Sequence, residues 1–164
     1  MSGVERALSP AAPAIGWALI LGGCGAWLTR LDAWYYRLRF PGWKPPDWAF
    51  GPVWTLIFAC AAWAFVRAWD APGATRGTRI AMVVAFLVNG ALNMLWSYLF
   101  FRRHRPDWAL VETLLLWISI LAMLVVVGLA SPWSAWLIAP YISWVTLAGF
   151  LTRSVVRLNG PFTA

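Results

Sequence analysis

Charged residues are absent from long stretches of this chain. Three charge-free intervals, Ala7–Thr29, Trp48–Val66 and Ile80–Phe101, are each about the 20 residues needed to cross the hydrocarbon core of a bilayer. A fourth interval, Thr113–Thr152, is about twice that length and is interrupted by Ser131-Pro132-Trp133, a turn signal. The pattern therefore predicts five membrane-spanning helices, with a very tight hairpin between the last two.

The fold class that follows is an all-α membrane protein, a bundle of five transmembrane helices. We expect one membrane domain over residues 1–164, with its spans at roughly 13–31, 47–69, 79–101, 107–130 and 133–157. The second, third and fourth connections are short, so consecutive helices should be antiparallel neighbours. The first connection, from about Asp32 to Pro46, is rich in aromatic residues and prolines and should be more than a tether.

The composition supports a membrane protein and excludes a soluble domain. The chain is 62% hydrophobic and 12% charged, whereas soluble domains carry roughly 25% charged residues. Cys24 and Cys60 fall inside predicted spans as small packing residues, so we expect no disulfide and no metal site. The formal net charge of +7 would suggest nucleic acid in a soluble protein, but here the arginines cluster in short loops beside apolar spans, and we expect no nucleic-acid partner.

The distribution of basic residues predicts an orientation. The side of the first loop carries Arg30, Arg37, Arg39, Lys44, Arg102, Arg103, Arg105, Arg153 and Arg157. The opposite side carries only Arg6, Arg67, Arg76 and Arg79. The positive-inside rule then places the first loop and the C-terminus in the cytoplasm for an inner or endoplasmic membrane, and it says little for an outer membrane.

Of three further features, one has a single interpretation and two allow two. His104 lies among arginines in a loop, where we expect it to be solvated. Glu112 is the one acid well inside a span, and it is either a functional intramembrane carboxylate or a residue near a helix N-terminus that reaches the interface. Ala18, Gly22 and Ala26 form a small-residue face that could contact a helix of the same chain or a second protomer.

The 14 tryptophans fall into two groups. Those near predicted span ends should form interfacial belts; they are Trp17, Trp48, Trp69, Trp108, Trp133 and Trp136. Trp54, Trp96 and Trp144 are not explained in this way, and Trp54 and Trp144 lie well inside their spans. A second role is therefore needed for these three.

Aromatic and polar residues share helical faces in three spans. The third span presents Asn89, Asn93, Trp96 and Phe100 at i, i+4, i+7 and i+11, bordered by Ser97. The second span presents Phe50, Trp54 and Phe58, and the fifth presents Tyr141, Trp144 and Ala148. The asparagines either bond between helices or form the polar edge of a pocket. These faces lie toward the first loop, so they predict a cavity for a flat, partly aromatic ligand, capped by a loop that contributes Tyr35 and Trp43; plain core packing is the alternative.

Three segments resemble the signature regions of the TspO / translocator-protein family of tryptophan-rich sensory proteins, also called peripheral benzodiazepine receptors. They are WYYRLRFPGWKPPDWAFGPVW at 34–54, NGALNMLWSYLFF at 89–101 and PYISWVTLAGFLTRSVVRLN at 140–159. The resemblance covers all five spans. It implies a five-helix bundle, usually a homodimer, that binds tetrapyrroles such as protoporphyrin IX and haem, and also isoquinoline or benzodiazepine-type synthetic ligands.

The resemblance also implies roles for individual residues. Tyr35, Trp54, Asn93, Trp96 and Trp144 match the family's ligand cavity, and tryptophans matching Trp54 and Trp144 are implicated in light-dependent porphyrin breakdown in some bacterial members. Where many members have Leu-Asn-Tyr, this chain has Leu151-Thr152-Arg153, so we do not expect cholesterol to bind. The full predicted ligand-binding set is Tyr35, Trp43, Phe50, Trp54, Phe58, Asn89, Asn93, Trp96, Ser97, Tyr141, Trp144 and Ala148.

The leading hypothesis is a multi-pass bacterial membrane receptor that takes a tetrapyrrole as ligand and requires no cofactor. Its partners would be membrane lipid, porphyrin-type molecules and a second copy of the chain. A tetrapyrrole or lipid transporter is one alternative, for which intramembrane charge or broken helices would argue, and Glu112 is the one such feature. A slow light-dependent porphyrin-degrading activity would use the same residues and is not separable by sequence.

Overall fold

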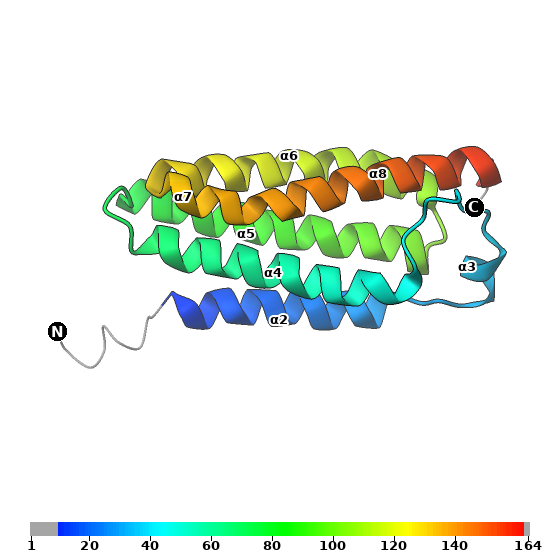
Figure 1. Ribbon diagram of the computed structural model, residues 1–164, viewed down its shortest axis with the longest axis horizontal. Helices are drawn as coiled ribbons and strands as arrows, with labels where there is room; N and C mark the ends of the chain where they lie inside the picture. Colours follow the sequence, from blue (N-terminus) through cyan, green and yellow to red (C-terminus); the bar gives the residue numbers. More distant parts are fainter. Residues whose placement is uncertain (1–9, 163–164) are drawn as a thin grey trace.

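The computed structural model describes residues 10–162, which form a bundle of long helices lying side by side (Figure 1). Five helical segments in this part of the chain are long and apolar enough to cross a membrane. The long helices are α2 (Ala11–Leu28), α4 (Asp47–Trp69), α5 (Arg76–Ser97), α6 (Pro106–Ala130) and α8 (Ala139–Asn159). The chain is therefore a multi-pass α-helical membrane protein, as its sequence predicts. Residues 1–9, which include Arg6 and the start of the first charge-free interval, lie outside the described part.

Short elements connect or extend the long helices. The first loop contains α3 (Ala33–Arg37), and the π-helical segment η1 (Tyr98–Arg102) continues α5. The predicted hairpin is as tight as expected, because α6 ends at Ala130 and α7 (Pro132–Ala135) begins after the single extended residue Ser131. Proline suits this start, since the first turn of a helix needs no N–H donor from it. The 3₁₀ segment η2 (Trp136–Ile138) then leads into α8.

The first loop with α3 and the C-terminal end of α8 lie at one end of the bundle (Figure 1). At the other end, the α4–α5 turn passes close to the α6–α7 hairpin. A Cβ atom on Gly73 of that turn would lie only 2.7 Å from the Ala130 carbonyl oxygen, so glycine is required there. The two ends are therefore closed in different ways, one by an α-helical loop and the other by two tight turns.

Some of the tryptophans predicted to form interfacial belts are exposed near helix ends, whereas the prediction is wrong for Trp17. Trp48, Trp133 and Trp136 are 76%, 81% and 72% exposed near helix ends. Trp17 instead points into the bundle, where its indole N–H donates to the Phe86 carbonyl oxygen at 2.9 Å. Gly90 leaves room for it, since a Cβ atom there would lie 3.0 Å from the Trp17 indole nitrogen. The missing side chain of Gly90 in α5 thus decides where Trp17 lies. A rule based only on the distance from span ends does not take this contact into account.

Candidate ligand cavity

A cavity of about 470 Å³ occupies the half of the bundle next to the first loop. Its wall receives side chains from the first loop and from each of the five long helices. Nine of the twelve residues predicted from the sequence line it: Tyr35, Phe50, Trp54, Phe58, Asn93, Trp96, Ser97, Trp144 and Ala148. The three helical faces predicted from spacing therefore do converge on one space.

Asn89 and Tyr141 do not line the cavity but form a buried polar chain behind it. Tyr141 donates to the Asn89 side-chain oxygen at 3.0 Å and accepts a hydrogen bond from the Asn93 amide at 3.1 Å. The Asn89 amide donates to the Ser119 hydroxyl of α6 at 2.9 Å. Asn89 thus takes the interhelical role, because a buried amide must be satisfied within the bundle. The chain joins α5, α6 and α8 and fixes Asn93, its member at the cavity wall.

Trp96 is oriented from two sides. Its indole N–H donates to the Thr113 hydroxyl at 3.1 Å, and that hydroxyl donates to the Ala109 carbonyl oxygen at 2.8 Å. Its ring stacks on Phe100, with centroids 5.1 Å apart and planes at 18°. A hydrogen bond and a stacked neighbour together restrict both side-chain torsions, so this part of the wall is preformed.

The tryptophans of α4 and α8 are held mainly by other aromatic rings. Trp54 stacks on Phe58 at 5.2 Å and meets Tyr141 edge-on at 5.8 Å. Trp144 meets Phe50 edge-on at 5.4 Å. The indole N–H of Trp144 is buried and finds no hydrogen-bond partner among residues 10–162. The wall on this side is thus an aromatic surface with an unused donor behind it.

Tyr35 closes the cavity from the first loop. Its hydroxyl donates to the Asp47 carboxylate at 2.6 Å, and Lys44 pairs with the same oxygen. Burial, together with the neighbouring Asp47 carboxylate, raises the pKa of Tyr35, so its hydroxyl stays protonated and remains a donor. The Lys44 ammonium also lies over the Phe40 ring at 4.8 Å. The loop and the start of α4 are therefore joined directly at the cavity.

The first loop is ordered internally by a helix cap and anchored to the rest of the chain at two further points. Asp32 caps α3 by accepting hydrogen bonds from the Trp34 and Tyr35 backbone N–H groups at 3.0 and 3.1 Å, and these bonds hold its pKa below the ordinary value. Trp34 stacks on His104 at 4.1 Å, so His104 is a contact of the loop and not a freely solvated residue as predicted. Asn159 of α8 exchanges two hydrogen bonds with the Arg39 backbone, at 2.7 and 2.9 Å. The loop is thus a docked cap and more than a tether.

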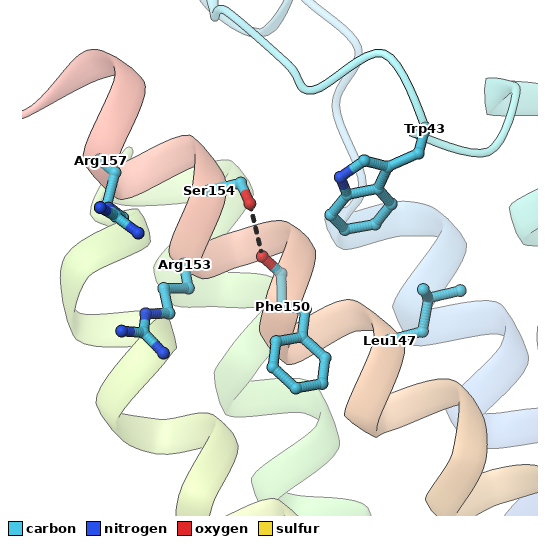
Figure 2. A pocket seen from close by; sticks show the side chains of 6 residues that line it. All are labelled: Trp43, Leu147, Phe150, Arg153, Ser154 and Arg157. Atoms are coloured by element: carbon cyan, nitrogen blue, oxygen red, sulfur yellow. Dashed lines mark hydrogen bonds between the residues drawn. The ribbon is translucent and has the colours of Figure 1, made fainter.

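Trp43, predicted to cover the cavity, lies outside it. It is 49% exposed and borders a separate groove on the outer face of α8 (Figure 2). A turn explains the difference: the Lys44 N–H bonds to the Pro41 carbonyl oxygen at 3.0 Å, and it is Lys44 that reaches Tyr35 and Asp47. Because neighbouring side chains in a turn point in different directions, the prediction for Trp43 is wrong.

The contribution of α2 to the cavity was not predicted. Its small-residue face, interpreted as a helix contact, partly borders open space, since a Cβ atom on Gly22 would meet no atom within 4 Å. The same is true of Gly25, which was not part of the predicted face. The only feature of the sequence that pointed to this surface was the spacing of small residues, four apart. That spacing does not distinguish a helix contact from a cavity wall. The cavity residues missed in the prediction are Leu21, Gly22, Gly25, Ala26, Thr29, Leu31, Asp47, Gly51, Thr55, Phe101, Thr113, Leu116 and Val145.

Glu112 is buried in the bundle, with 4% of its surface exposed. Neither carboxylate oxygen has a hydrogen-bond partner among residues 10–162. It shares a stripe of α6 with Ser119, two turns away, which bonds to α5. It is not among the residues that line the cavity.

Comparison with known proteins finds a matching family and several similar sequences. A model of the TspO/MBR family matches residues 14–158. The tryptophan-rich protein TspO of Chlorobaculum tepidum is 35% identical over 147 residues, covering 88% of this chain and 92% of that protein. The translocator protein of Bos taurus is 33% identical over 155 residues, 92% of each chain. The tryptophan-rich sensory protein of Cereibacter sphaeroides is 32% identical over 151 residues, 87% of this chain and 92% of its own.

Proposed function

Because the chain belongs to the TspO/MBR family, we propose that it is a membrane receptor or sensor that binds a tetrapyrrole, such as protoporphyrin IX or haem, in the cavity next to its first loop. The same cavity would accept isoquinoline or benzodiazepine-type synthetic ligands. We place the receptor in a bacterial membrane as a homodimer, with the first loop and the C-terminus in the cytoplasm if that membrane is the inner one.

One observation carries this proposal: Trp54, Trp96 and Trp144, from three different helices, line a single cavity. Its volume of about 470 Å³ falls in the range of small-molecule sites, which are mostly apolar with a few polar groups that fix orientation. Flat aromatic ligands stack on such walls. A tetrapyrrole offers the large π surface that this wall is suited to bind.

Asn93 supplies the polar contact that would orient such a ligand. Its amide N–H₂ is held by Tyr141 at 3.1 Å, and its side-chain oxygen accepts no hydrogen bond from residues 10–162. That oxygen is an acceptor available to a donor group on the ligand. A fixed acceptor on a largely apolar wall favours a ligand that carries a hydrogen-bond donor at its periphery.

A titration of the detergent-purified protein with protoporphyrin IX, followed by tryptophan fluorescence, tests the proposal. We expect saturable quenching, because the indoles lining the cavity would lie against the porphyrin, and we expect an isoquinoline ligand to reverse it. Quenching that rises linearly without saturation, and is unaffected by the competitor, would mean that porphyrin only partitions into the micelle.

A second candidate function, light-dependent porphyrin degradation, is favoured by one feature of the same cavity. Two oxidisable indoles, Trp54 and Trp144, both line it. Illumination of the porphyrin complex in the presence of oxygen should then bleach the porphyrin absorption faster than in micelles without protein. Equal bleaching rates would leave binding as the only function.

A further inference from the structure

The groove beside Trp43 is separate from the ligand cavity. It has a volume of about 430 Å³ and is lined by Trp43, Leu147, Phe150, Arg153, Ser154 and Arg157 (Figure 2). None of these residues lines the cavity. The groove lies between the outer face of α8 and the first loop, so a molecule in it would contact both.

Two of its residues are arginines that the described structure leaves without a partner. Arg153 and Arg157 are one helical turn apart, and their guanidinium groups extend to the same side of α8 (Figure 2). Neither guanidinium forms an ion pair or hydrogen bond with residues 10–162, whereas Arg105 pairs with Asp107 and Arg102 bonds to the end of α2. Two neighbouring unpaired guanidinium groups create a site for an anion.

The hydrogen-bond donors of the groove are limited to those arginines and Trp43. The Ser154 hydroxyl already donates to the Phe150 carbonyl oxygen at 2.9 Å (Figure 2). The indole nitrogen of Trp43 is on the ring edge that faces α8, and no acceptor among residues 10–162 takes its hydrogen (Figure 2). The donor set is thus suited to oxygen atoms that carry negative charge.

The other end of the groove is apolar and lies deeper along α8. Leu147 and Phe150 are 36% and 58% exposed on the outside of the bundle, where lipid surrounds a membrane protein. From position 147 to position 157 the helix rises about 15 Å, enough to pass from the upper acyl chains to the headgroup. The groove therefore has the polarity of a phospholipid, basic at the helix end and apolar toward the bilayer centre.

We propose that this groove binds an anionic phospholipid, with its phosphate between Arg153 and Arg157, its glycerol under Trp43 and an acyl chain along Leu147 and Phe150. Guanidinium groups bind phosphate oxygens through paired N–H donors, and basic pockets beside membrane helices bind anionic headgroups. Because Asn159, two residues beyond Arg157, already joins α8 to the loop, the lipid would add a further link between the two. This proposal does not depend on the nature of the cavity ligand.

Native mass spectrometry of the purified protein, with added phosphatidylglycerol or phosphatidylcholine, tests it. We expect phosphatidylglycerol to bind more tightly, and the double variant Arg153→Gln/Arg157→Gln to lose about tenfold or more of that affinity, as two charge-assisted hydrogen bonds would. Arg30→Gln/Arg103→Gln is the matched control: it removes the same charge from two exposed arginines of the first-loop side and should bind like the parent.

Three outcomes would overturn the proposal. One is an equal loss in the control pair, which would mean that only net charge matters. Another is equal binding of phosphatidylcholine by the parent. The third is full competition by glycerol 1-phosphate, which has the phosphate but no acyl chain, since the site would then take a free phosphate and not a lipid. If the double variant does not fold by circular dichroism, Arg153→Lys/Arg157→Lys keeps the charge but loses the planar donors, and must still lower the affinity.

Discussion

The two halves of this bundle are built from the same helices but pack in opposite ways. Away from the first loop, α4 presents Ala61, Ala64 and Ala68, each 0% exposed, and the neighbouring helices close over them with buried side chains such as Met82 and Val127. Near the first loop, the same helix presents Phe50, Trp54 and Phe58, and a cavity of about 470 Å³ remains. At these positions α4 therefore presents alanines to the dense half and aromatic rings to the cavity.

This difference indicates that the cavity has a well-packed aromatic wall and does not result from loose packing. Its rings pack on neighbours along the wall, as Trp54 does on Phe58 and Trp96 on Phe100. Rings held in this way do not collapse into the space they border. Opposite them, Gly22 and Gly25 of α2 have no side chain to fill it. Both the packed rings and the glycines of α2 are needed to keep the cavity open, because close packing otherwise drives the association of helices in a bilayer.

The largest expected effect comes from overfilling the dense half. Ala64→Leu adds three carbon atoms at a fully buried position and should destabilise the fold by about 1–3 kcal/mol, because neighbouring side chains must move from their preferred positions. The measurement is the thermal unfolding temperature of the detergent-purified variant. An unchanged unfolding temperature would mean that there is free space around Ala64, and that this half of the bundle is not densely packed.

The matching change in the hollow half should leave stability unchanged and weaken binding. Gly25→Leu places a side chain where a Cβ atom meets nothing within 4 Å, so the fold should tolerate it, while protoporphyrin IX affinity falls roughly tenfold or more through steric exclusion. Gly16→Leu is the control, since Gly16 lies on the same helix, has equally open surroundings and does not line the cavity. Equal affinity in both variants would place the porphyrin elsewhere.

Features that depend on a single helix could be predicted from the sequence, whereas contacts between helices could not. Charge-free intervals predict the spans because lipid excludes charge over a fixed thickness. The faces around Trp54, Asn93 and Trp144 are predictable because residues three or four apart share a side of any helix. Trp17 is not, because its place depends on the missing side chain of Gly90, a contact between helices far apart in the sequence.

Outside the helices the sequence pattern carries less information. Trp43 and Lys44 are neighbours in an irregular loop, and nothing periodic tells which of them points to the cavity. The turn closed by the Pro41 carbonyl decides it, together with the Asp47 carboxylate that attracts Lys44 and not an indole. Asn89 and Asn93 share a face and both bond to Tyr141, yet only Asn93 lines the cavity, while Asn89 also bonds to Ser119 of α6. Tertiary partners, which no single span encodes, settle these cases.

A smaller effect is expected where the hollow half is closed by the first loop. Tyr35→Phe keeps the ring but removes the hydroxyl that donates to Asp47 at 2.6 Å. Ligand release, measured by stopped-flow recovery of tryptophan fluorescence, should become about fivefold faster, as expected for one lost hydrogen bond. Tyr36→Phe is the control, because Tyr36 is 65% exposed on the same short helix. A release rate that does not respond to Tyr35→Phe would mean that the loop does not limit exit.

The smallest effect should come from exchanging one aromatic wall for another. Trp54→Phe and Trp144→Phe each keep a ring beside the cavity but remove the indole and part of the stacking area, so protoporphyrin IX affinity should fall by only about threefold. Light-dependent porphyrin loss should fall further, because the oxidisable indole is gone while an aromatic surface remains.

Trp17 would be a poor control, since its N–H bonds to Phe86 inside the bundle. Trp133, 81% exposed at the opposite end of the bundle, is the better one, and Trp133→Phe should bind and bleach porphyrin like the parent. If all three variants behave alike in both assays, the aromatic rings of the wall contribute to packing of the bundle and do not contact a bound porphyrin.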